Sequence, residues 1–181
     1  MRFIFDFDAE KCSACGACAI ACMDQNDIDI EAGMEPYRKI YQLERPDARI
    51  YLTTACMHCP DAHCAEACHF ACIKQDEETG LTTYDTIKCV GCRACARACP
   101  YDAISFRPTG QERPKVKMEK CHGCIERVKV GLDPACVHSC PTGALNWHWS
   151  EDQEEEYSLV SLCKEWKLAD LVKNGMLPFT K

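Results

Sequence analysis

Cysteine is the residue that most constrains this chain, because sixteen of its eighteen cysteines fall into four segments of four. The first and third segments share the spacing C-x2-C-x2-C-x3-C and the wider frame K-C-x-x-C-x-A-C-A-x-A-C, which indicates an internal repeat. The second and fourth segments keep the opening C-x-x-C and the closing C-x-x-x-C but lengthen the stretch between them. In chain order the four sets are Cys12, Cys15, Cys18 and Cys22; Cys56, Cys59, Cys64 and Cys68; Cys89, Cys92, Cys95 and Cys99; and Cys121, Cys124, Cys136 and Cys140.

Three kinds of site account for most cysteine-rich chains: disulfides, zinc sites and iron–sulfur clusters. In the ferredoxin pattern C-x2-C-x2-C-x3-C-P, the first three thiolates hold one cubane cluster and the fourth completes a second. Segments one and three have this spacing, although Met23 stands where segment one would have the proline. Zinc usually takes two separated C-x-x-C pairs, and cysteines three apart on one turn are badly placed for disulfides. The spacing therefore predicts [4Fe–4S] clusters, with a zinc-stabilised interaction module as a rival.

Composition and charge agree with a fold that metal supports. Apolar residues make up 47% of the chain, and leaving out 18 cysteines among 181 residues lowers this to about 37%, a thin supply for a core. Metal binding can hold such a fold together. The formal charge of −7 would reach about −15 with four oxidised clusters of about −2 each, which argues against nucleic acid as a partner. A merely acidic soluble surface fits the charge equally well.

Hydrophobic patterning predicts an α+β chain of short elements. Strand-like runs cover residues 3–7, 50–54, 81–84, 104–106 and 144–148, and short helices are expected near Ala19 and Ala96. Residues 24–49 are predicted to be an irregular insertion and residues 107–114 a linker. Residues 158–173 fit a helix with Ser158 as its N-cap. One face of this helix is apolar and is expected either to pack on the body of the protein or to dock onto another subunit; it carries Leu159, Leu162, Cys163 and Trp166.

Over residues 3–149, the four motifs in this order resemble the iron–sulfur subunits of the dimethyl sulfoxide reductase family of molybdenum and tungsten enzymes. The resemblance implies two bacterial-ferredoxin-like β-α-β units with a pseudo-twofold relation, plus irregular insertions and a C-terminal helix. The first unit is expected to comprise residues 1–54 together with 112–149. The second is expected to comprise residues 55–111, followed by a C-terminal tail over 150–181.

The same resemblance implies four [4Fe–4S] clusters whose ligands cross between segments one and four and between segments two and three. The implied ligand sets are Cys12, Cys15, Cys18 and Cys140; Cys121, Cys124, Cys136 and Cys22; Cys56, Cys59, Cys64 and Cys99; and Cys89, Cys92, Cys95 and Cys68. Some relatives replace the second cysteine of segment three and hold a three-iron cluster there. Because Cys92 is present in this chain, four irons are expected.

By this resemblance the chain is a non-catalytic electron-transfer subunit of an oxidoreductase complex, of the kind used in anaerobic respiration. It would relay electrons between a molybdopterin (Mo/W) catalytic subunit and a membrane anchor or other redox partner. No nucleophile–base pair, phosphate-binding glycine loop or open metal position stands out in the sequence. Alternatives are a free polyferredoxin and the electron-transfer subunit of a hydrogenase or formate complex.

The location of the protein is left open by the sequence. The chain has no apolar run of membrane-spanning length, and its first residues lack the apolar stretch of an export signal. By its own sequence it is expected in the cytoplasm, unless it is exported folded with a partner that carries a signal.

Several residues near the motifs have two interpretations each. Cys72 falls four residues after Cys68, where segments three and four have alanine, so it is predicted to fill a small buried site, or else to replace Cys68 as a ligand. Cys163 is predicted to be a buried thiol. His69 replaces the expected proline of segment two, which frees a backbone N–H. Three lysines directly before a first cysteine either stabilise reduced clusters or are solvated surface residues: Lys11, Lys88 and Lys120. Four histidines inside the motifs are expected beside the clusters or at the surface: His58, His63, His122 and His138.

Overall fold

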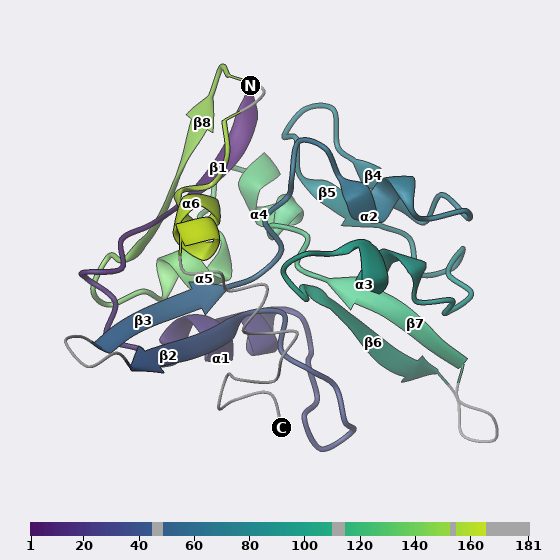
Figure 1. The fold of residues 1–181 in the computed structure, drawn as a ribbon, viewed down its shortest axis with the longest axis horizontal. Coiled ribbons are helices and arrows are strands. Elements are labelled where there is room, and N and C mark those ends of the chain that lie inside the picture. Colours follow the sequence, from purple (N-terminus) through teal and green to yellow (C-terminus); the bar gives the residue numbers. More distant parts are fainter. Residues whose placement is uncertain (45–48, 110–114, 153–154, 166–181) are drawn as a thin grey trace.

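The computed structural model describes residues 1–44, 49–109, 115–152 and 155–165. Within these ranges the chain forms four two-stranded antiparallel sheets and six short helices (Figure 1). In chain order the elements are β1 (Arg2–Phe7), α1 (Ala17–Gln25), β2 (Lys39–Glu44), β3 (Arg49–Thr54), α2 (His63–Glu66), β4 (Ile73–Gln75), β5 (Thr82–Tyr84), α3 (Ala94–Ala98), β6 (Ile104–Thr109), β7 (Lys115–Lys120), α4 (Ile125–Lys129), α5 (Ala135–His138), β8 (Leu145–Ser150) and α6 (Ser158–Glu165).

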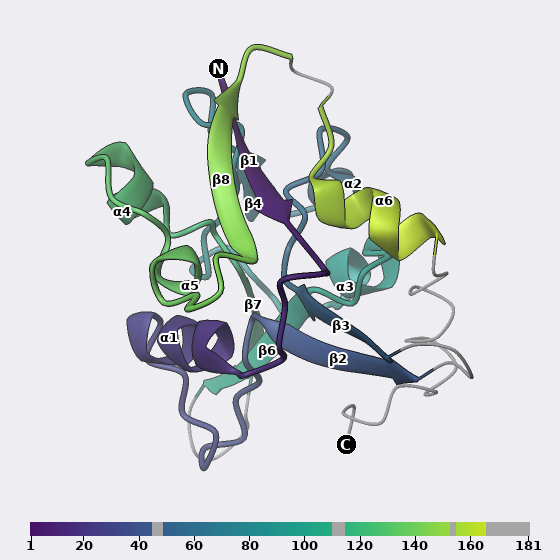
Figure 2. The same cartoon turned by 90° about the vertical axis from the view of Figure 1, so that its left-hand side faces the viewer.

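The first region is built on the pairing of β1 with β8, in the register Phe3↔Trp149 to Phe7↔Leu145. Phe3, Phe5 and Phe7 are all buried, and the Phe3 ring stacks on Trp147 with 4.8 Å between ring centroids. Helix α6 packs on β1. Helix α1 packs on α5, and this pair lies below the β1–β8 sheet in the view of Figure 2. The β2–β3 hairpin adds its buried side chains to the same core. We call β1, β2, β3, β8, α1, α4, α5 and α6 the first region.

The second region comprises β4, β5, β6, β7, α2 and α3, on the right of Figure 1. Strands β4 and β5 form one hairpin, and β6 pairs with β7 in the register Ile104↔Lys120 to Thr109↔Lys115. The buried core of this region is small and contains two cysteines among its five members, which are Cys72, Ile73, Cys95, Ile104 and Met118. The second region therefore has much less apolar packing than the first.

The mixed helix and strand content confirms the predicted α+β class. A strand forms at each of the five predicted positions, and helices form near Ala19 and Ala96. Two expectations were wrong in part. The insertion over 24–49 contains strand β2, and residues 107–109 of the expected linker continue β6; its residues 110–114 lie outside the described residues. The division into two units stays a prediction, although β7 pairs with β6 across the expected boundary at 111–112.

The C-terminal helix packs on the body of the protein over its described length. Leu159, Val160 and Cys163 are buried in the core of the first region. Ser158 does not act as an N-cap for this helix: it is the first helical residue, and its hydroxyl oxygen accepts a hydrogen bond from the Phe7 N–H at 2.7 Å. The predicted continuation of the helix from Trp166 to residue 173 lies outside the described residues.

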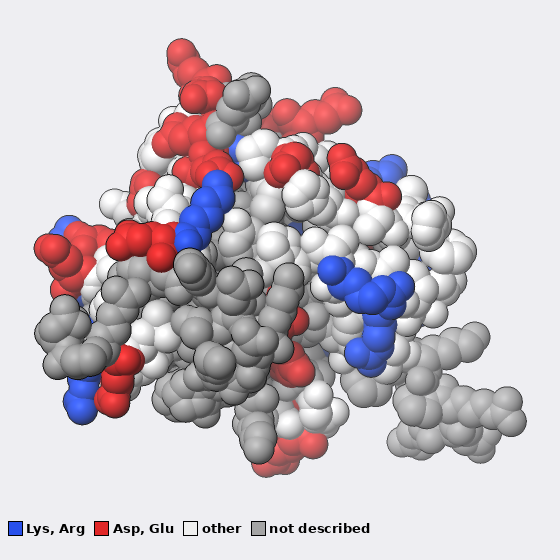
Figure 3. Space-filling view, in the orientation of Figure 1, with Lys and Arg blue, Asp and Glu red and all other residues white. Residues whose placement is uncertain are grey.

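The face shown in Figure 3 has an acidic edge and a basic group, while acidic and basic side chains lie side by side elsewhere on it. Asp and Glu gather along the upper edge of Figure 3, around the end of β8, while Lys and Arg gather over α3. The exposed Arg93 and Arg97 belong to the α3 group. Within the described ranges, no helix is both long enough and apolar enough to cross a membrane.

Candidate iron–sulfur centres

Two pairs of short helices bring the four cysteine segments together. Helix α1 of segment one packs on α5 of segment four, and α2 of segment two packs on α3 of segment three. Each helix carries one or two cysteines of its segment or is followed by the closing one. The packing therefore sets segment one against four and segment two against three, as the crossed ligand sets require (Figures 1 and 2).

Two cavities collect cysteines from paired segments. One cavity, closed by Phe7, Ile40 and Leu145, is lined by Cys12, Cys15, Cys18 and Cys140. The other, closed by Met57 and Ile104, is lined by Cys56, Cys59, Cys64 and Cys99. In each cavity three thiols come from one segment and the fourth is the closing cysteine of the paired segment.

The remaining eight segment cysteines also lie as two mixed groups. Burial raises the pKa of Cys22 to about 12; the Arg38 guanidinium opposes this shift, and the neighbouring Cys136 and Cys124 add to it. Burial and Cys22 likewise raise the pKa of Cys121. In the second region, burial followed by repulsion from thiolates of both segments raises the pKa of Cys95; these neighbours are Cys68, Cys89 and Cys92. Mutual repulsion of this kind is expected where several thiolates converge, and the positive charge of iron would offset it.

One backbone conformation recurs in the opening C-x-x-C of every segment. The residue before the second cysteine has a positive φ: 53° at Ala14, 43° at His58, 76° at Gly91 and 72° at Gly123. In three of these loops that residue donates its N–H to the sulfur of the first cysteine, over N···Sγ distances of 3.4, 3.4 and 3.3 Å. The Ala14 N–H also bonds to Cys12. Hydrogen bonds to a sulfur favour its thiolate form.

Glycine is required at two of these positions. A Cβ at Gly91 would lie 2.3 Å from the carbonyl oxygen of Val116, and one at Gly123 would lie 2.5 Å from Leu81 Cδ2. Segments three and four thus pack their opening loops against neighbouring chain with no room for a side chain. Segments one and two use Ala14 and His58 instead, which carry the strain of a left-handed conformation.

The closing cysteines also receive backbone hydrogen bonds. Cys72 N–H donates to Cys68 Sγ at 3.4 Å, and Ala103 N–H donates to Cys99 Sγ at 3.5 Å. Cys72 thus occupies the position that Ala103 occupies in segment three. Burial opposes ionisation of Cys68, but hydrogen bonds from the backbone N–H groups of Cys72, Phe70 and Ile73 and from the Cys72 thiol outweigh it and lower the pKa of Cys68.

Buried cations lie among the cysteines. Arg38 is 3% exposed, and its Nη1 donates to the Thr53 hydroxyl at 3.4 Å. Burial disfavours its charge, and the surrounding thiolates, of which Cys136 and Cys121 contribute most, raise its pKa. Lys120 is fully buried and donates from Nζ to Cys56 Sγ at 3.5 Å. Four converging thiols, N–H donors aimed at sulfur and buried positive charge are a donor set that fits an anionic [4Fe–4S] cluster.

A site for a single metal ion finds less support. Among the described residues, no three His, Cys, Asp or Glu side chains form a group that could hold one metal ion. A cubane is larger than an ion and holds its thiolates farther apart, with four irons between them.

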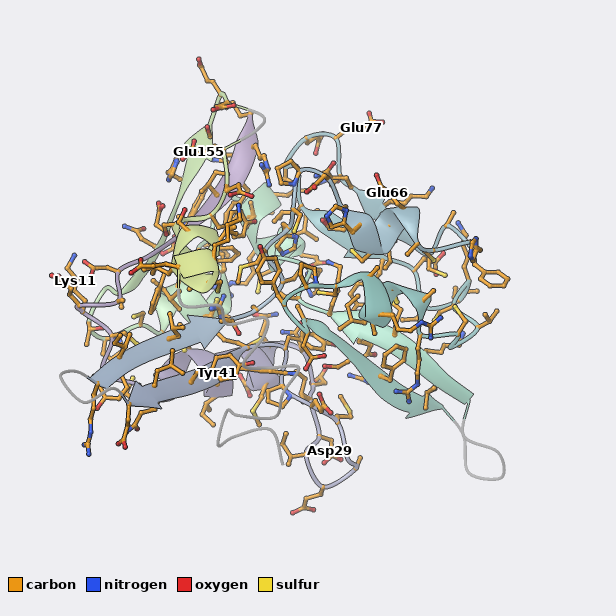
Figure 4. All side chains as sticks on the ribbon, in the orientation of Figure 1. Lys11, Asp29, Tyr41, Glu66, Glu77 and Glu155 are labelled. Atoms are coloured by element: carbon orange, nitrogen blue, oxygen red, sulfur yellow. The ribbon has the colours of Figure 1, made fainter. Side chains whose placement is uncertain are left out.

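The histidines and lysines that the sequence singled out lie in different environments. His58 is buried, and its Nδ1 accepts the Thr82 N–H at 2.8 Å. The remaining three motif histidines are half-buried or exposed: His63, His122 and His138. Lys11 and Lys88 are exposed as well. Lys11 points away from the body in Figure 4 and pairs with Asp8. Sequence reasoning missed Arg38 altogether, because no local pattern distinguishes it from a solvated arginine.

Comparisons with known proteins agree with this geometry. The family model of the 4Fe–4S dicluster domain matches residues 48–149. The protein is 32% identical to the B subunit of the anaerobic dimethyl sulfoxide reductase of Haemophilus influenzae, over 86% of its own length and 78% of that subunit. It is 34% identical to the corresponding subunit of Escherichia coli K12, over 81% and 73%, and 29% identical to the arsenate respiratory reductase iron-sulfur subunit of Shewanella sp. ANA-3, over 93% and 91%.

The family match covers more than half of the chain, and the relatives align over most of both lengths. Their names agree with the resemblance that the cysteine spacing suggested, and the matched domain confirms the prediction of [4Fe–4S] clusters. The chain belongs to the 4Fe–4S dicluster-domain proteins and, among them, to the iron–sulfur subunits of the dimethyl sulfoxide reductase family.

Proposed function

We propose that this protein is a non-catalytic electron-transfer subunit that holds four [4Fe–4S] clusters and relays electrons between a molybdopterin catalytic subunit and a second redox partner. The clusters sit in two ferredoxin-like units related by a pseudo-twofold axis. Each cluster takes three thiolates from one segment and the closing thiolate of the paired segment, in the four ligand sets that the resemblance implies.

One observation carries the proposal. The closing Cys140 lines the same cavity as three cysteines of segment one, and the closing Cys99 lines the same cavity as three cysteines of segment two. A fourth thiol arriving from a paired segment is the arrangement that the ferredoxin spacing serves. It also accounts for sixteen of the eighteen cysteines in equal sets.

The chain's own residues would set the reduction potentials of the clusters and shield the clusters from water. A bound [4Fe–4S] cluster supplies a one-electron redox centre whose potential depends on hydrogen bonds and burial. Backbone N–H groups at His58, Gly91 and Gly123 bond to ligand sulfur and would stabilise the added negative charge of a reduced cluster. Apolar walls such as those of Phe7 and Ile104 keep water from the sulfurs.

Two exposed thiols suit entry and exit of electrons. Among the eighteen cysteines, Cys15 of segment one and Cys92 of segment three are exposed. They belong to the first and fourth ligand sets, so the clusters of these two sets would approach the surface at separate points. The remaining cysteines are buried or half-buried, as a relay shielded from solvent requires.

The partner is proposed from the relatives. They are named as subunits of dimethyl sulfoxide and arsenate reductases, which are multi-subunit enzymes by those names. We infer a large molybdopterin-containing oxidoreductase subunit as the partner of this chain as well. A free polyferredoxin would lack such a partner and would purify alone.

The proposal is tested by anaerobic purification of the native protein. The expected result is brown protein with about sixteen irons and sixteen acid-labile sulfides per chain, as four cubanes require, together with a large subunit that contains molybdopterin. Colourless protein, or protein holding zinc, would overturn the cluster assignment. Brown protein that elutes alone would replace the subunit model with the polyferredoxin one.

A single substitution tests the relay itself. Cys95→Ala should damage the segment-three cluster and stop physiological electron transfer, while the partner still reacts with artificial dyes. Cys163→Ala is the matched control, because this buried cysteine belongs to no segment. Full native turnover in the Cys95→Ala complex would contradict the relay.

A further inference from the structure

Three lysines occupy the same position in the sequence repeat, directly before the first cysteine of a segment. Two of them are surface residues: the side chains of Lys11 and Lys88 are 59% and 50% exposed and pair with Asp8 and Asp85. Lys120 is 0% exposed. The lysine before the first cysteine is therefore exposed in segments one and three and buried in segment four.

The β7 strand explains why Lys120 is buried. Side chains two apart along a strand share a face, so Lys120 lies on the same face as Val116 and Met118. Met118 is 1% exposed and belongs to the core of the second region. Pairing with Ile104 of β6 holds this end of the strand inside the protein.

The described partners of the Lys120 ammonium are two carbonyl oxygens and one sulfur. Nζ donates to the carbonyl oxygens of Thr82 and Cys121, the latter at 2.9 Å, and to Cys56 Sγ at 3.5 Å. None of these is a carboxylate. A buried ammonium is costly unless negative charge lies nearby, and carbonyl oxygens supply only dipoles.

Lys120 stands between two of the four cysteine groups. It lines the cavity of Cys56, Cys59, Cys64 and Cys99. It also bonds to the backbone of Cys121, whose thiol is grouped with Cys22 and Cys124. These two groups come from different segment pairs, so Lys120 lies where the two units meet.

We propose that Lys120 is the shared positive countercharge of two clusters, those whose ligand sets contain Cys56 and Cys121, and raises the reduction potential of both; we call these two the central clusters. This inference rests on the proposed function, because it requires clusters in the sets that contain Cys56 and Cys121. A cubane with four thiolates carries about −2 when oxidised and gains one negative charge on accepting an electron. A nearby buried cation stabilises the reduced form more than the oxidised form, because the attraction grows with the charge on the cluster.

Lys120 is a positioning residue in this scheme, since its Nζ reaches a ligand sulfur but binds no iron. It would make the two central clusters easier to reduce than the same clusters without it. Lys11 and Lys88 cannot act in the same way, because water and a carboxylate screen their charges.

The test compares Lys120→Met with Lys88→Met in the intact anaerobic complex. Redox titration followed by electron paramagnetic resonance measures the midpoint potential of each cluster. Lys120→Met should lower the reduction equilibrium constant of two clusters by about tenfold, which is 59 mV for a one-electron couple, and leave the other two unchanged. Lys88→Met should shift none of them by that amount.

A charge-conserving variant separates charge from shape. Lys120→Arg should keep all four potentials near those of the native protein. If Lys120→Met loses iron while Lys120→Arg keeps it, the positive charge is required and the inference is supported. If both variants lose iron, or if Lys120→Met moves the potentials no more than Lys88→Met does, the inference is wrong.

The iron content of the native protein keeps the two proposals apart. Native protein without about sixteen irons per chain contradicts the proposed function itself, as four cubanes would require them. Native protein with full iron, combined with unshifted potentials in Lys120→Met, leaves the relay standing and removes only the role of Lys120.

Discussion

The two regions of the molecule carry the same kind of cysteine segment on very different amounts of apolar core. The first region buries the aromatic side chains of β1 against β8 and α6, and the Phe5 ring packs edge-on against Tyr157, the residue before α6. The core of the second region has five buried members, of which Cys72 and Cys95 are cysteines. Apolar burial supplies most of the stability of an ordinary fold. We therefore expect the second region to depend on its clusters for structure far more than the first.

Removal of iron should give the largest difference between the two regions. After anaerobic chelation, amide hydrogen exchange in α2, α3, β4 and β5 should become at least about tenfold faster than in β1 and β8, because a metal-held fold loses its cross-links with the metal. Mass spectrometry of peptides from both regions measures this. Equal loss of protection in both regions would refute the comparison.

A truncation in the core of the first region should have the next largest effect. Phe3→Ala removes a ring that is 1% exposed, and it should lower the free energy of unfolding of the holoprotein by about 3–5 kcal/mol in thermal or denaturant melts. Phe70→Ala, at a side chain that is 47% exposed, is the control and should change stability by less than about 0.5 kcal/mol. A small effect of Phe3→Ala would mean that clusters hold the first region too.

The two extra cysteines allow a matched comparison between regions. Cys72→Ala and Cys163→Ala each remove a buried thiol, and each should cost about 1 kcal/mol without loss of iron. Alanine at position 72 would retain the N–H that bonds to Cys68, as Ala103 does in segment three. Iron analysis checks the result. Loss of one cluster from the Cys72→Ala variant would show that Cys72 is a ligand. It would also mean that the structure of the second region depends on metal even more strongly.

The smallest expected effect is a pH dependence in the first region. His148 bonds to Asp6 at 2.6 Å, and this carboxylate raises the pKa of the imidazole above its ordinary value of 6.5. A raised pKa means that the stabilisation is complete below about pH 6.5 and disappears as the pH rises through the folded-state value. Because the pair is partly exposed, it should be worth less than about 1 kcal/mol. His148→Gln should destabilise the protein at pH 6 and have no effect at pH 9, as measured by denaturant melts; a constant difference would exclude the ion pair as its cause.

Cysteine spacing predicted the chemistry better than it predicted the architecture. The four segments are local patterns, so the clusters and the family resemblance followed from them, while the ligand sets stay predictions. The α+β class followed from hydrophobic patterning. The β2 strand was missed because the nearby Gly33 and Pro36 resemble loop residues. Strand β7 was missed although Val116, Met118 and Lys120 alternate with polar residues, because the final lysine looks like a surface residue.

The charges around the sites were the hardest part to predict. Arg38 comes from the insertion, far along the chain from Cys136 and Cys121, the two cysteines that act on it most strongly, so only the folded protein brings them together. The burial of Lys120 had a visible signal in the period of two along β7, but that signal carries weight only once β7 is accepted as a strand. Tertiary context, rather than local preference, decides which of three equivalent lysines becomes buried.

The left-handed residues of the cysteine segments have a consequence for the protein before its cofactors arrive. Glycine reaches this conformation with little strain, whereas other residues must overcome about 1 kcal/mol or more. Each segment carries one such non-glycine residue near its first cysteines: Ala14, His58, Arg93 and Cys124. Loops without iron should accordingly relax in all four segments alike, so that cofactor delivery has to restore the same bend in each of them.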